Sequence, residues 1–311
     1  MNKRSIHVFL AIILLAGITG YYFNIRSSAD VKENFQEKIP ATPKITKTIS
    51  IGVISDNAVK HIKLFQPTAD YIAAKLSDSR VTYEGKVIVV KSVDNMTELL
   101  REQKLDLYME SPFATVIIAN KSGAVPFLRR WKDGAAEYYS VFIVRKNSSI
   151  NTLADFAGKT ITFEDPGSTS GYLLPKAYLI QNGFNVSQSS GKNNIRYAFS
   201  GEDENTPLWV VEGTSDIGAI SNLNFKNLPD SIKVNLRMID RTIDLPRFVV
   251  SHRSGMEQTT VEQIKQILLD MDQDPQGIKI MKDFQNTAKY DEISGEDEIF
   301  TSIRDMIRSL E

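Results

Sequence analysis

Apolar and polar residues follow one another along the chain in the rhythm of an α/β protein. Ile49, Ile51 and Val53 alternate with Ser50 and Gly52, which predicts a half-buried strand. A helical spacing of apolar residues follows at 65–76. The same patterns predict strands at 86–90 and 105–109, and helices at 96–103 and 113–119. Strands that alternate with helices in this way are typical of a mostly parallel, wound sheet.

A second run of alternating elements begins after Tyr138. We predict strands at 139–144, 160–163, 195–199, 217–220 and 247–250, and helices at 153–157 and 170–182. Three more helices are predicted at 261–271, 278–284 and 299–310. This order predicts two α/β lobes, with lobe I formed by 47–140 and 248–311 and lobe II by 141–247. The chain would then cross between lobes near Ser140 and near Pro246, and no sequence repeat relates the lobes.

The N-terminal segment differs from the rest in being basic and then apolar. Lys3 and Arg4 precede residues 5–25, which contain no Asp, Glu, Lys or Arg. A basic start followed by an apolar stretch indicates an export signal, and its length is also close to that of a bilayer-spanning helix. Residues 1–25 are therefore predicted to be a signal peptide or a membrane anchor at 6–25. Residues 26–46 are predicted to be a linker, which places the lobes in the periplasm or another extracytoplasmic space.

Composition removes several classes of function. The chain has 37 Lys and Arg residues against 38 Asp and Glu residues, so it lacks the positive excess of nucleic-acid-binding proteins. It contains no cysteine, which excludes disulfides and thiolate metal sites. Its three histidines are far apart in the sequence. We therefore expect no nucleic-acid partner, no metal site and no cofactor.

The most informative segment runs from Thr162 to Pro175. Ser168, Thr169, Ser170 and Gly171 stand where a predicted strand has ended and a helix begins. A helix start leaves backbone N–H groups unpaired and carries partial positive charge, so it favours anions. The alternative is a simple helix cap, which needs one hydroxyl where this segment offers three in a row. Pro175 lies about a turn inside this helix and predicts an irregular first turn.

Beyond this reading, the segment Phe163–Pro175 resembles the ligand-binding motif of the phosphate, phosphite and phosphonate substrate-binding proteins of ABC transporters. Further resemblances are found at 51–55, 105–109, 138–144 and 213–219. The likeness covers most of the chain from Ile49 onward. It implies a periplasmic-binding-protein fold, in which two lobes joined by two hinge crossovers close around a ligand.

The resemblance also implies roles for individual residues. Ser168, Thr169 and Ser170 would hold the phosphoryl oxygens, and Gly171 would let the backbone approach the ligand. Tyr138 would donate its hydroxyl from the hinge, and Asp216 would face the other end of the ligand. The alternatives are a hinge packing role for Tyr138 and a solvated turn for Asp216.

Three positions depart from the family pattern: Asn95, Glu110 and Asp203 (or Glu202 if the loop is shifted) stand where the resemblance leads us to expect other residue types. Carboxylates at two of these positions would repel a phosphonate dianion unless they were protonated or bridged by a cation. A ligand that itself carries positive charge is the other possibility. Solvent-exposed loop positions would make the same acids irrelevant to binding.

The sequence therefore predicts the solute-binding component of an ABC transporter rather than an enzyme. Its ligand would be a small phosphorus oxyanion (phosphonate, phosphite or phosphate), and its partner a membrane permease. One alternative is a membrane-tethered sensor or accessory protein of the same fold. Another is a hydrolase using Ser168 or Ser170, which lacks a neighbouring base in the sequence. Trp131 and Trp209 are expected in cores, and Arg129 and Arg130 are expected to be solvated.

Overall fold

The computed structural model describes residues 44–189, 191, 194–293 and 295–311. The predicted signal or anchor segment and residues 26–43 of the predicted linker lie outside these residues. The first strand already begins at Ile45, so the start of lobe I lies slightly earlier than the sequence predicted.

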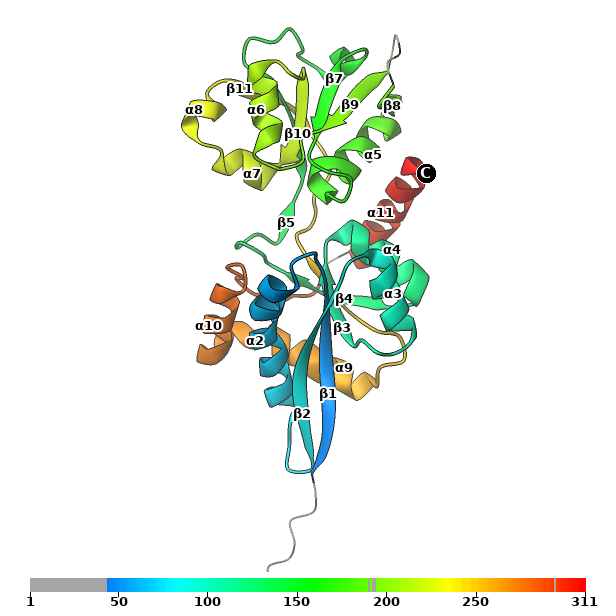
Figure 1. Cartoon of the computed structure of the whole chain (residues 1–311), viewed down its shortest axis with the longest axis vertical. Helices are drawn as coiled ribbons and strands as arrows, with labels where there is room; N and C mark the ends of the chain where they lie inside the picture. Colours follow the sequence, from blue (N-terminus) through cyan, green and yellow to red (C-terminus); the bar gives the residue numbers. More distant parts are fainter. Residues whose placement is uncertain (1–43, 190, 192–193, 294) are drawn as a thin grey trace, which may run out of the picture. The chain divides into compact units, whose positions relative to one another are not determined.

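Lobe I is built on a mixed sheet whose strand order is β14-β4-β13-β3-β1-β2 (Figure 1). Its strands are β1 (Ile45–Ile54), β2 (Val81–Val90), β3 (Leu107–Glu110), β4 (Val125–Arg130), β13 (Val249–His252) and β14 (Tyr290–Asp291). β1 pairs in parallel with β2 and β3, whereas β13 runs antiparallel to β3 and β4. The parallel strands bring their carboxyl ends to one edge of the sheet, which is where ligand sites of such sheets lie.

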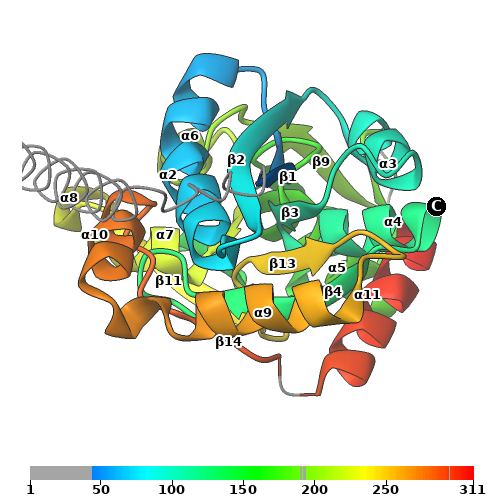
Figure 2. The same cartoon turned by 90° about the horizontal axis from the view of Figure 1, so that it is seen from below.

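Helices cover both faces of this sheet (Figure 2). They are α2 (Ala58–Leu76), α3 (Val93–Arg101), α4 (Pro112–Ser122), α9 (Gln258–Leu269), α10 (Pro275–Asp283) and α11 (Glu296–Leu310), with a 3₁₀ turn at Met271–Gln273. Ile51 and Leu107 belong to the core under α2 and α9. Tyr108 belongs to the core under α3 and α4, because neighbouring strand residues point to opposite faces.

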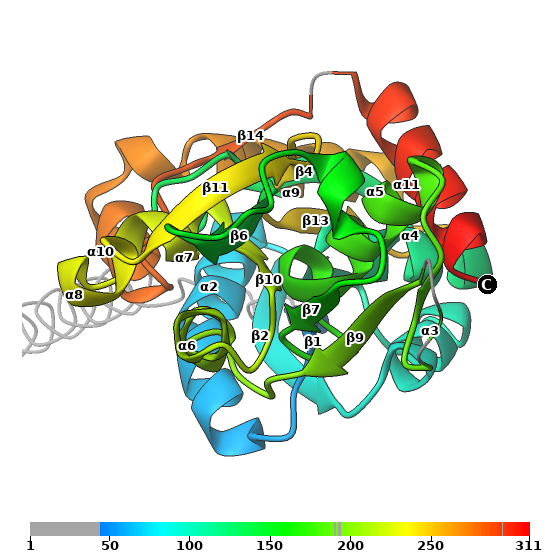
Figure 3. The same cartoon turned by 90° about the horizontal axis from the view of Figure 1, so that it is seen from above.

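Lobe II has a second sheet, with the strand order β11-β6-β10-β7-β9-β8 (Figure 3). Its strands are β6 (Ser140–Arg145), β7 (Thr160–Phe163), β8 (Val186–Ser187), β9 (Ile195–Phe199), β10 (Ile217–Ser221) and β11 (Leu236–Arg241). Its helical segments are η1 (Leu153–Phe156), η2 (Thr169–Leu173), α5 (Leu174–Gln181), α6 (Asn205–Glu212), α7 (Asn222–Asn227) and α8 (Asp230–Lys233). Phe142 and Phe163 face the core under α5, and Ile143 faces the core under α6.

The chain passes between the two sheets twice. Both passages meet in a short antiparallel ribbon of β5 (Glu137–Tyr138) and β12 (Leu245–Pro246), in which Tyr138 stands opposite Leu245. The two-lobe α/β fold with two hinge crossovers, as predicted from the sequence, is thus confirmed. The ribbon also fixes Tyr138 at the hinge, where the sequence placed it.

One hydrophobic cluster joins helices of both lobes. It contains Phe113 and Val116 of α4, Leu174 and Ala177 of α5, and Phe300, Ile303 and Met306 of α11. α11 therefore packs against lobe I and lobe II at the same time. Its assignment to lobe I from sequence order alone does not describe this packing.

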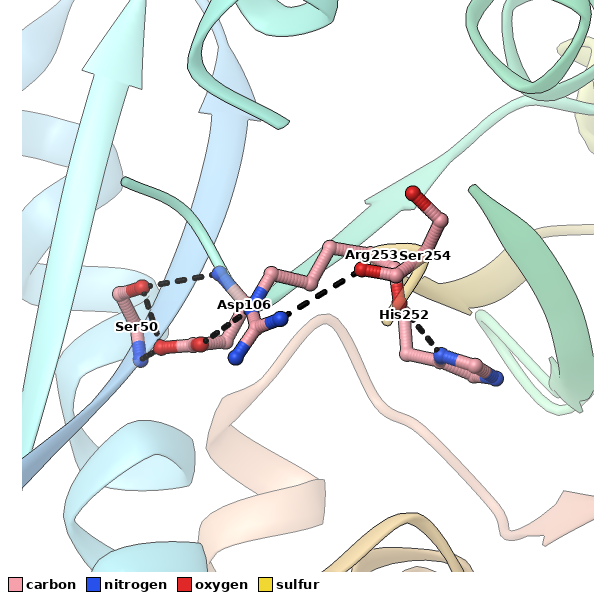
Figure 4. A network of polar contacts seen from close by, with 5 residues as sticks. All are labelled: Ser50, Asp106, His252, Arg253 and Ser254. Atoms are coloured by element: carbon pink, nitrogen blue, oxygen red, sulfur yellow. Dashed lines mark hydrogen bonds and ion pairs between the residues drawn. The ribbon is translucent and has the colours of Figure 1, made fainter. Parts of the chain in front are cut away.

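The same carboxylate clamp occurs once in each lobe. Asp106 accepts hydrogen bonds from the backbone N–H of Ser50 (2.9 Å) and from its hydroxyl (2.8 Å), as Figure 4 shows. Asp216 accepts the corresponding bonds from Thr160, both at 2.9 Å. In each lobe the two clamp residues are 56 positions apart in the sequence. Each stands directly before a residue of a parallel strand pairing, Ile51 with Leu107 in lobe I and Ile161 with Ile217 in lobe II. The lobes thus repeat a structural device that the sequence pattern did not reveal.

Candidate functional site

The predicted anion-binding segment forms a tight turn between β7 and a helix. Asp165 accepts a hydrogen bond from the Gly167 N–H (2.7 Å), and its carbonyl accepts one from the Ser168 N–H (3.2 Å). The Ser168 hydroxyl oxygen accepts from the Gly171 N–H (2.9 Å), so Ser168 caps the helix. The same hydroxyl donates to Glu164 Oε2 (2.6 Å). Ser168 therefore fills the capping role that the sequence analysis weighed as an alternative.

Thr169 differs from its neighbour because its side chain is buried without a partner. It is 5% exposed, and its Oγ1 has no hydrogen-bond partner among the described residues. The Tyr138 side chain lies close enough to act on this hydroxyl without forming a hydrogen bond of normal geometry: burial raises the pKa of Tyr138 to about 12, while the Arg247 charge and the interaction with Thr169 oppose the rise. A buried hydroxyl without a partner costs about 1–3 kcal/mol, which a ligand oxygen would recover.

The helix begins with an irregular turn, as Pro175 predicted. Thr169–Leu173 is a turn of π-helix, in which Leu173 N–H bonds the Ser168 carbonyl at 2.9 Å. The α-helix α5 starts only at Leu174, which places Pro175 in its first turn, where no N–H is required. Ser170 is partly exposed, and its carbonyl accepts from the Ser140 hydroxyl at 2.7 Å.

Gly171 is required by the packing of the turn itself. A Cβ at this position would come within 2.5 Å of Glu164 Oε2 and 2.8 Å of the Ser168 hydroxyl. The sequence analysis expected Gly171 to make room for a ligand. In the structure, the space left by the missing Cβ is taken by the Glu164 side chain.

Two carboxyl groups meet beside this turn. Burial raises the pKa of Glu164 to about 8, and both the charge of Asp203 and its hydrogen bond to Glu164 contribute to the rise. The Ser168 hydroxyl opposes it. A hydrogen bond between two carboxyl groups requires that one of them holds a proton. The pair therefore carries one negative charge, not two, when the bond is formed.

Glu110 occupies the corresponding edge of lobe I. It ends β3, and its Oε1 accepts the Ile54 N–H at 3.2 Å. Burial raises the pKa of Glu110 to about 7, against the effect of backbone N–H groups and of the positive charges of Arg130 and Lys132. Near neutral pH this side chain is thus partly protonated, which weakens its repulsion of an anion.

Three cationic side chains lie near the hinge: Arg130 at the end of β4, Lys132 two residues later, and Arg247 directly after β12. Arg130 is completely buried between the rings of Phe248 and Phe284, so the expectation that it is solvated is wrong. Arg129 is partly buried and forms a bidentate pair with Asp291 (2.9 Å for both bonds). Burial lowers the pKa of Arg130 to about 10, because a charged group is costly inside a protein.

The other two cations, Lys132 and Arg247, are close enough to Arg130 for their charges to interact with it. Burial lowers the pKa of Lys132 to about 8, and the charges of Arg247 and Arg130 lower it further, whereas Asp203 opposes the change. The Arg247 guanidinium stacks 4.8 Å from the centre of the Tyr138 ring. Lys132 and Arg247 therefore connect the lobe I cations to Asp203 and Tyr138.

The structure brings most of the expected residues into one region and leaves two outside it. Ser168, Thr169, Gly171, Tyr138 and Asp203 are linked through the interactions described above. Ser170 adjoins them in the turn, and Glu110 interacts with the charge of Lys132, which in turn interacts with Asp203.

Asn95 and Asp216 have no hydrogen bond to the hydroxyl turn among the described contacts. Asn95 is exposed at the start of α3, where its Oδ1 accepts from Ser92 Oγ at 3.1 Å. Asp216 bonds Thr160 at the start of β7, whereas Ser168 follows the end of that strand. The strand separates the two residues, so its clamp explains Asp216 without a ligand.

Sequence reasoning missed Glu164, Lys132 and Arg247. Glu164 stood inside the motif that we singled out, and Arg247 follows directly on Pro246 at the second crossover. Their importance depends on burial and on contacts between distant segments, which periodicity does not show. Adjacency to the motif and to the hinge was the signal that could have found them.

The chain is similar to known proteins over most of its length. A family model described as "ABC transporter, phosphonate, periplasmic substrate-binding protein" matches residues 51–298. The chain belongs to this family. The match contains both lobes and the whole Ser168–Gly171 turn, so the family predicted from the sequence motif is confirmed.

Individual relatives support the same assignment. The phosphonates-binding periplasmic protein of Escherichia coli strain K12 is 30% identical over 240 residues, which are 74% of this chain and 68% of the relative. The phosphate-import protein PhnD of Mycolicibacterium smegmatis is 38% identical over 144 residues, 43% of this chain and 44% of that protein. The chain thus spans less than half the length of the Mycolicibacterium relative.

Solved structures match the fold. XAC2383 from Xanthomonas citri, determined with chloride ion or with ATP bound, superposes with a TM-score of 0.75 at 24% identity. The superposition covers 85% of this chain and 98% of XAC2383. Both lobes of this chain therefore have the same fold as XAC2383.

Proposed function

We propose that this protein is the extracytoplasmic solute-binding component of an ABC transporter and binds a small phosphorus oxyanion between its lobes. The observation that carries the proposal is the buried hydroxyl of Thr169, which has no partner among the described residues. It stands at the start of a helix, between two further hydroxyl residues, where partial positive charge favours an anion. A phosphonate, phosphite or phosphate oxygen would satisfy it.

The acidic departures from the family pattern are compatible with such a ligand. Glu164 and Asp203 share a proton through their hydrogen bond, and Glu110 has a pKa of about 7. Protonated carboxyl groups do not repel the ligand and can donate hydrogen bonds to its oxygens. Protonation, the condition under which acids tolerate a phosphonate dianion, is therefore supported for Glu164 and Glu110.

The family's role implies a membrane permease as partner, and we extend this partner to the present chain. Among the helices in the described part of the chain, none is both long and apolar enough to cross a membrane. Retention of residues 6–25 as an anchor remains a prediction. His61 and His252 each contact a backbone carbonyl of lobe I and none of the described contacts joins either to Ser168, so nothing here favours a hydrolase.

Isothermal titration calorimetry tests the ligand class. Phosphate, phosphite, methylphosphonate and 2-aminoethylphosphonate would be titrated into the folded protein, and we expect heat of binding from at least one. Thr169→Val keeps the shape of the side chain but removes its hydroxyl, and should weaken binding by about tenfold or more. Thr46→Val, on an exposed part of β1, is the matched control and should bind like the wild type. No heat from any of the four ligands would refute the proposal.

A further inference from the structure

Two of the cations near the hinge, Arg130 and Arg247, have side-chain donors without a partner among the described residues. Arg130 has one side-chain bond, from Nη2 to Gln285 (2.8 Å), and its Nε and Nη1 have no partner among the described residues. Arg247 Nε is also buried without a partner, and its nearest carboxylate, Asp133, lies 3.9 Å from Nη2. Buried cations are stable only when a counter-charge is supplied.

The neighbouring acids are not available to supply that charge. Glu164 is bonded to Ser168 and shares a hydrogen bond with Asp203. Glu110 accepts the N–H groups of Ile54 and Ser111 within its own lobe. Asp133 is mostly exposed to solvent, which screens its attraction for Arg247. The region is therefore nearly balanced in formal charge, yet its unused bonding capacity is cationic.

This unused capacity faces the hydroxyl turn of lobe II through two connections. Arg247 stacks on Tyr138, whose hydroxyl adjoins Thr169. Lys132 interacts electrostatically with Asp203, which is bonded to Glu164 beside Ser168. Arg130 is held between two aromatic rings and interacts through its charge with Arg247 and Lys132, so it adds positive potential rather than a direct bond.

We propose that the ligand carries a second anionic group, which Lys132 and Arg247 bind while the hydroxyls of Ser168–Ser170 hold its phosphoryl group. The ligand class is a small phosphonate with a carboxylate or a second phosphoryl group. This inference rests on the proposed function and narrows it. An arginine fork and a lysine ammonium bind carboxylate and phosphoryl oxygens equally well, so the test distinguishes the two groups.

Calorimetry on the full-length protein compares three probes with methylphosphonate as reference. Phosphonoacetate adds a carboxylate, methylenediphosphonate adds a phosphoryl group, and 2-aminoethylphosphonate adds an amine. We expect phosphonoacetate or methylenediphosphonate to bind about tenfold more tightly than methylphosphonate, because hydrogen bonds to charged groups are the strong ones.

The substitutions Arg247→Gln and Lys132→Gln should remove this preference. Their loss of affinity for the doubly anionic probe should exceed their loss for methylphosphonate by about tenfold. Lys146→Gln, at an exposed lobe II position, is the control for net charge and should keep the preference.

The outcomes distinguish failure of the second anionic group from failure of phosphorus-oxyanion binding as a whole. If methylphosphonate binds but neither doubly anionic probe binds more tightly, the inference is wrong and the proposed function stands. Preferred binding of 2-aminoethylphosphonate would also overturn the inference, because it would show that the acids rather than the cations select the ligand. If no phosphorus oxyanion binds at all, the proposed function fails first.

Discussion

At the scale of single residues, Ser168, Thr169 and Ser170 are neighbours whose oxygens meet different surroundings. Ser168 caps a helix and bonds Glu164, Thr169 is buried without a partner, and Ser170 bonds the first hinge crossover through its carbonyl. Within one motif, Ser168 therefore stabilises the turn, whereas Thr169 is available to bind a ligand. Thr169 is the member of the motif whose hydroxyl makes no hydrogen bond of normal geometry among the described residues, although Tyr138 lies beside it.

Glu164→Gln should change how stability depends on pH. The folded-state pKa of Glu164 is about 8, above its ordinary 4.5, so the folded protein holds a proton that the unfolded chain has released. Stability is therefore lost as pH rises through this window. Glutamine cannot ionise, so the melting temperature of the variant relative to wild type should rise as pH increases from about 4.5 to about 8. Thermal unfolding measures this, with the exposed Glu84→Gln as control; a pH-independent difference would contradict the shared proton.

Asp216→Ala separates a structural role from a ligand contact. The substitution leaves the N–H and hydroxyl of Thr160 without their acceptor, which should cost about 1–3 kcal/mol of unfolding free energy. Ligand affinity should stay unchanged. Asp106→Ala removes the matching clamp in lobe I and also the ion pair of Asp106 with Arg253 (3.1 Å), so it should cost at least as much. Lost affinity with unchanged stability would return Asp216 to the ligand site.

Residue roles were only partly predictable from the sequence. The hydroxyl motif and Tyr138 were found because local pattern and family resemblance point to them. Glu164, Lys132 and Arg247 act through burial and through neighbours more than thirty positions away, such as Asp203 beside Glu164. Such contacts leave no trace in periodicity, and Arg130 was misjudged for the same reason.

At the scale of elements, the strand and helix pattern was predictable where periodicity is strong. β7 is observed at Thr160–Phe163 as predicted, and α11 ends at Leu310 as predicted. β11 and α6 were missed, and so was the two-residue strand β14. These short segments have mixed composition, and tertiary pairing rather than local pattern stabilises them.

The π-helical turn gives a prediction of its own. Gly171→Ala would place a Cβ within 2.5 Å of Glu164 and 2.8 Å of the Ser168 hydroxyl, so one of these side chains must move. Overpacking of this kind costs about 1–3 kcal/mol of stability, and the displaced turn should also weaken ligand binding. Calorimetry and chemical denaturation measure the two effects. Gly134→Ala, where a Cβ meets nothing within 4 Å, is the control for added bulk, although its positive φ of 74° adds some strain.

At the scale of the whole molecule, the cluster under α11 couples the two lobes. Phe300 is 5% exposed and packs with residues from both α4 and α5. Because one core serves both lobes, they should unfold together. The order of elements in the sequence could not reveal this, since it assigns α11 to one lobe.

The two tryptophans make this coupling measurable, because Trp131 lies in lobe I and Trp209 in α6 of lobe II. Variants that keep only one of them, Trp131→Phe or Trp209→Phe, should report the same unfolding midpoint. Phe300→Ala should lower the unfolding free energy by about 3–5 kcal/mol. It should also separate the two midpoints. Distinct midpoints in proteins with Phe300 intact would show that the lobes unfold independently.

The most direct test of the central claim is a crystal structure of the protein with methylphosphonate bound. We predict that phosphonate oxygens lie about 2.5–3.0 Å from the Thr169 hydroxyl and from the neighbouring donors of Ser168–Ser170. A ligand bound elsewhere, or a Thr169 hydroxyl that still lacks a partner in the complex, would contradict the account.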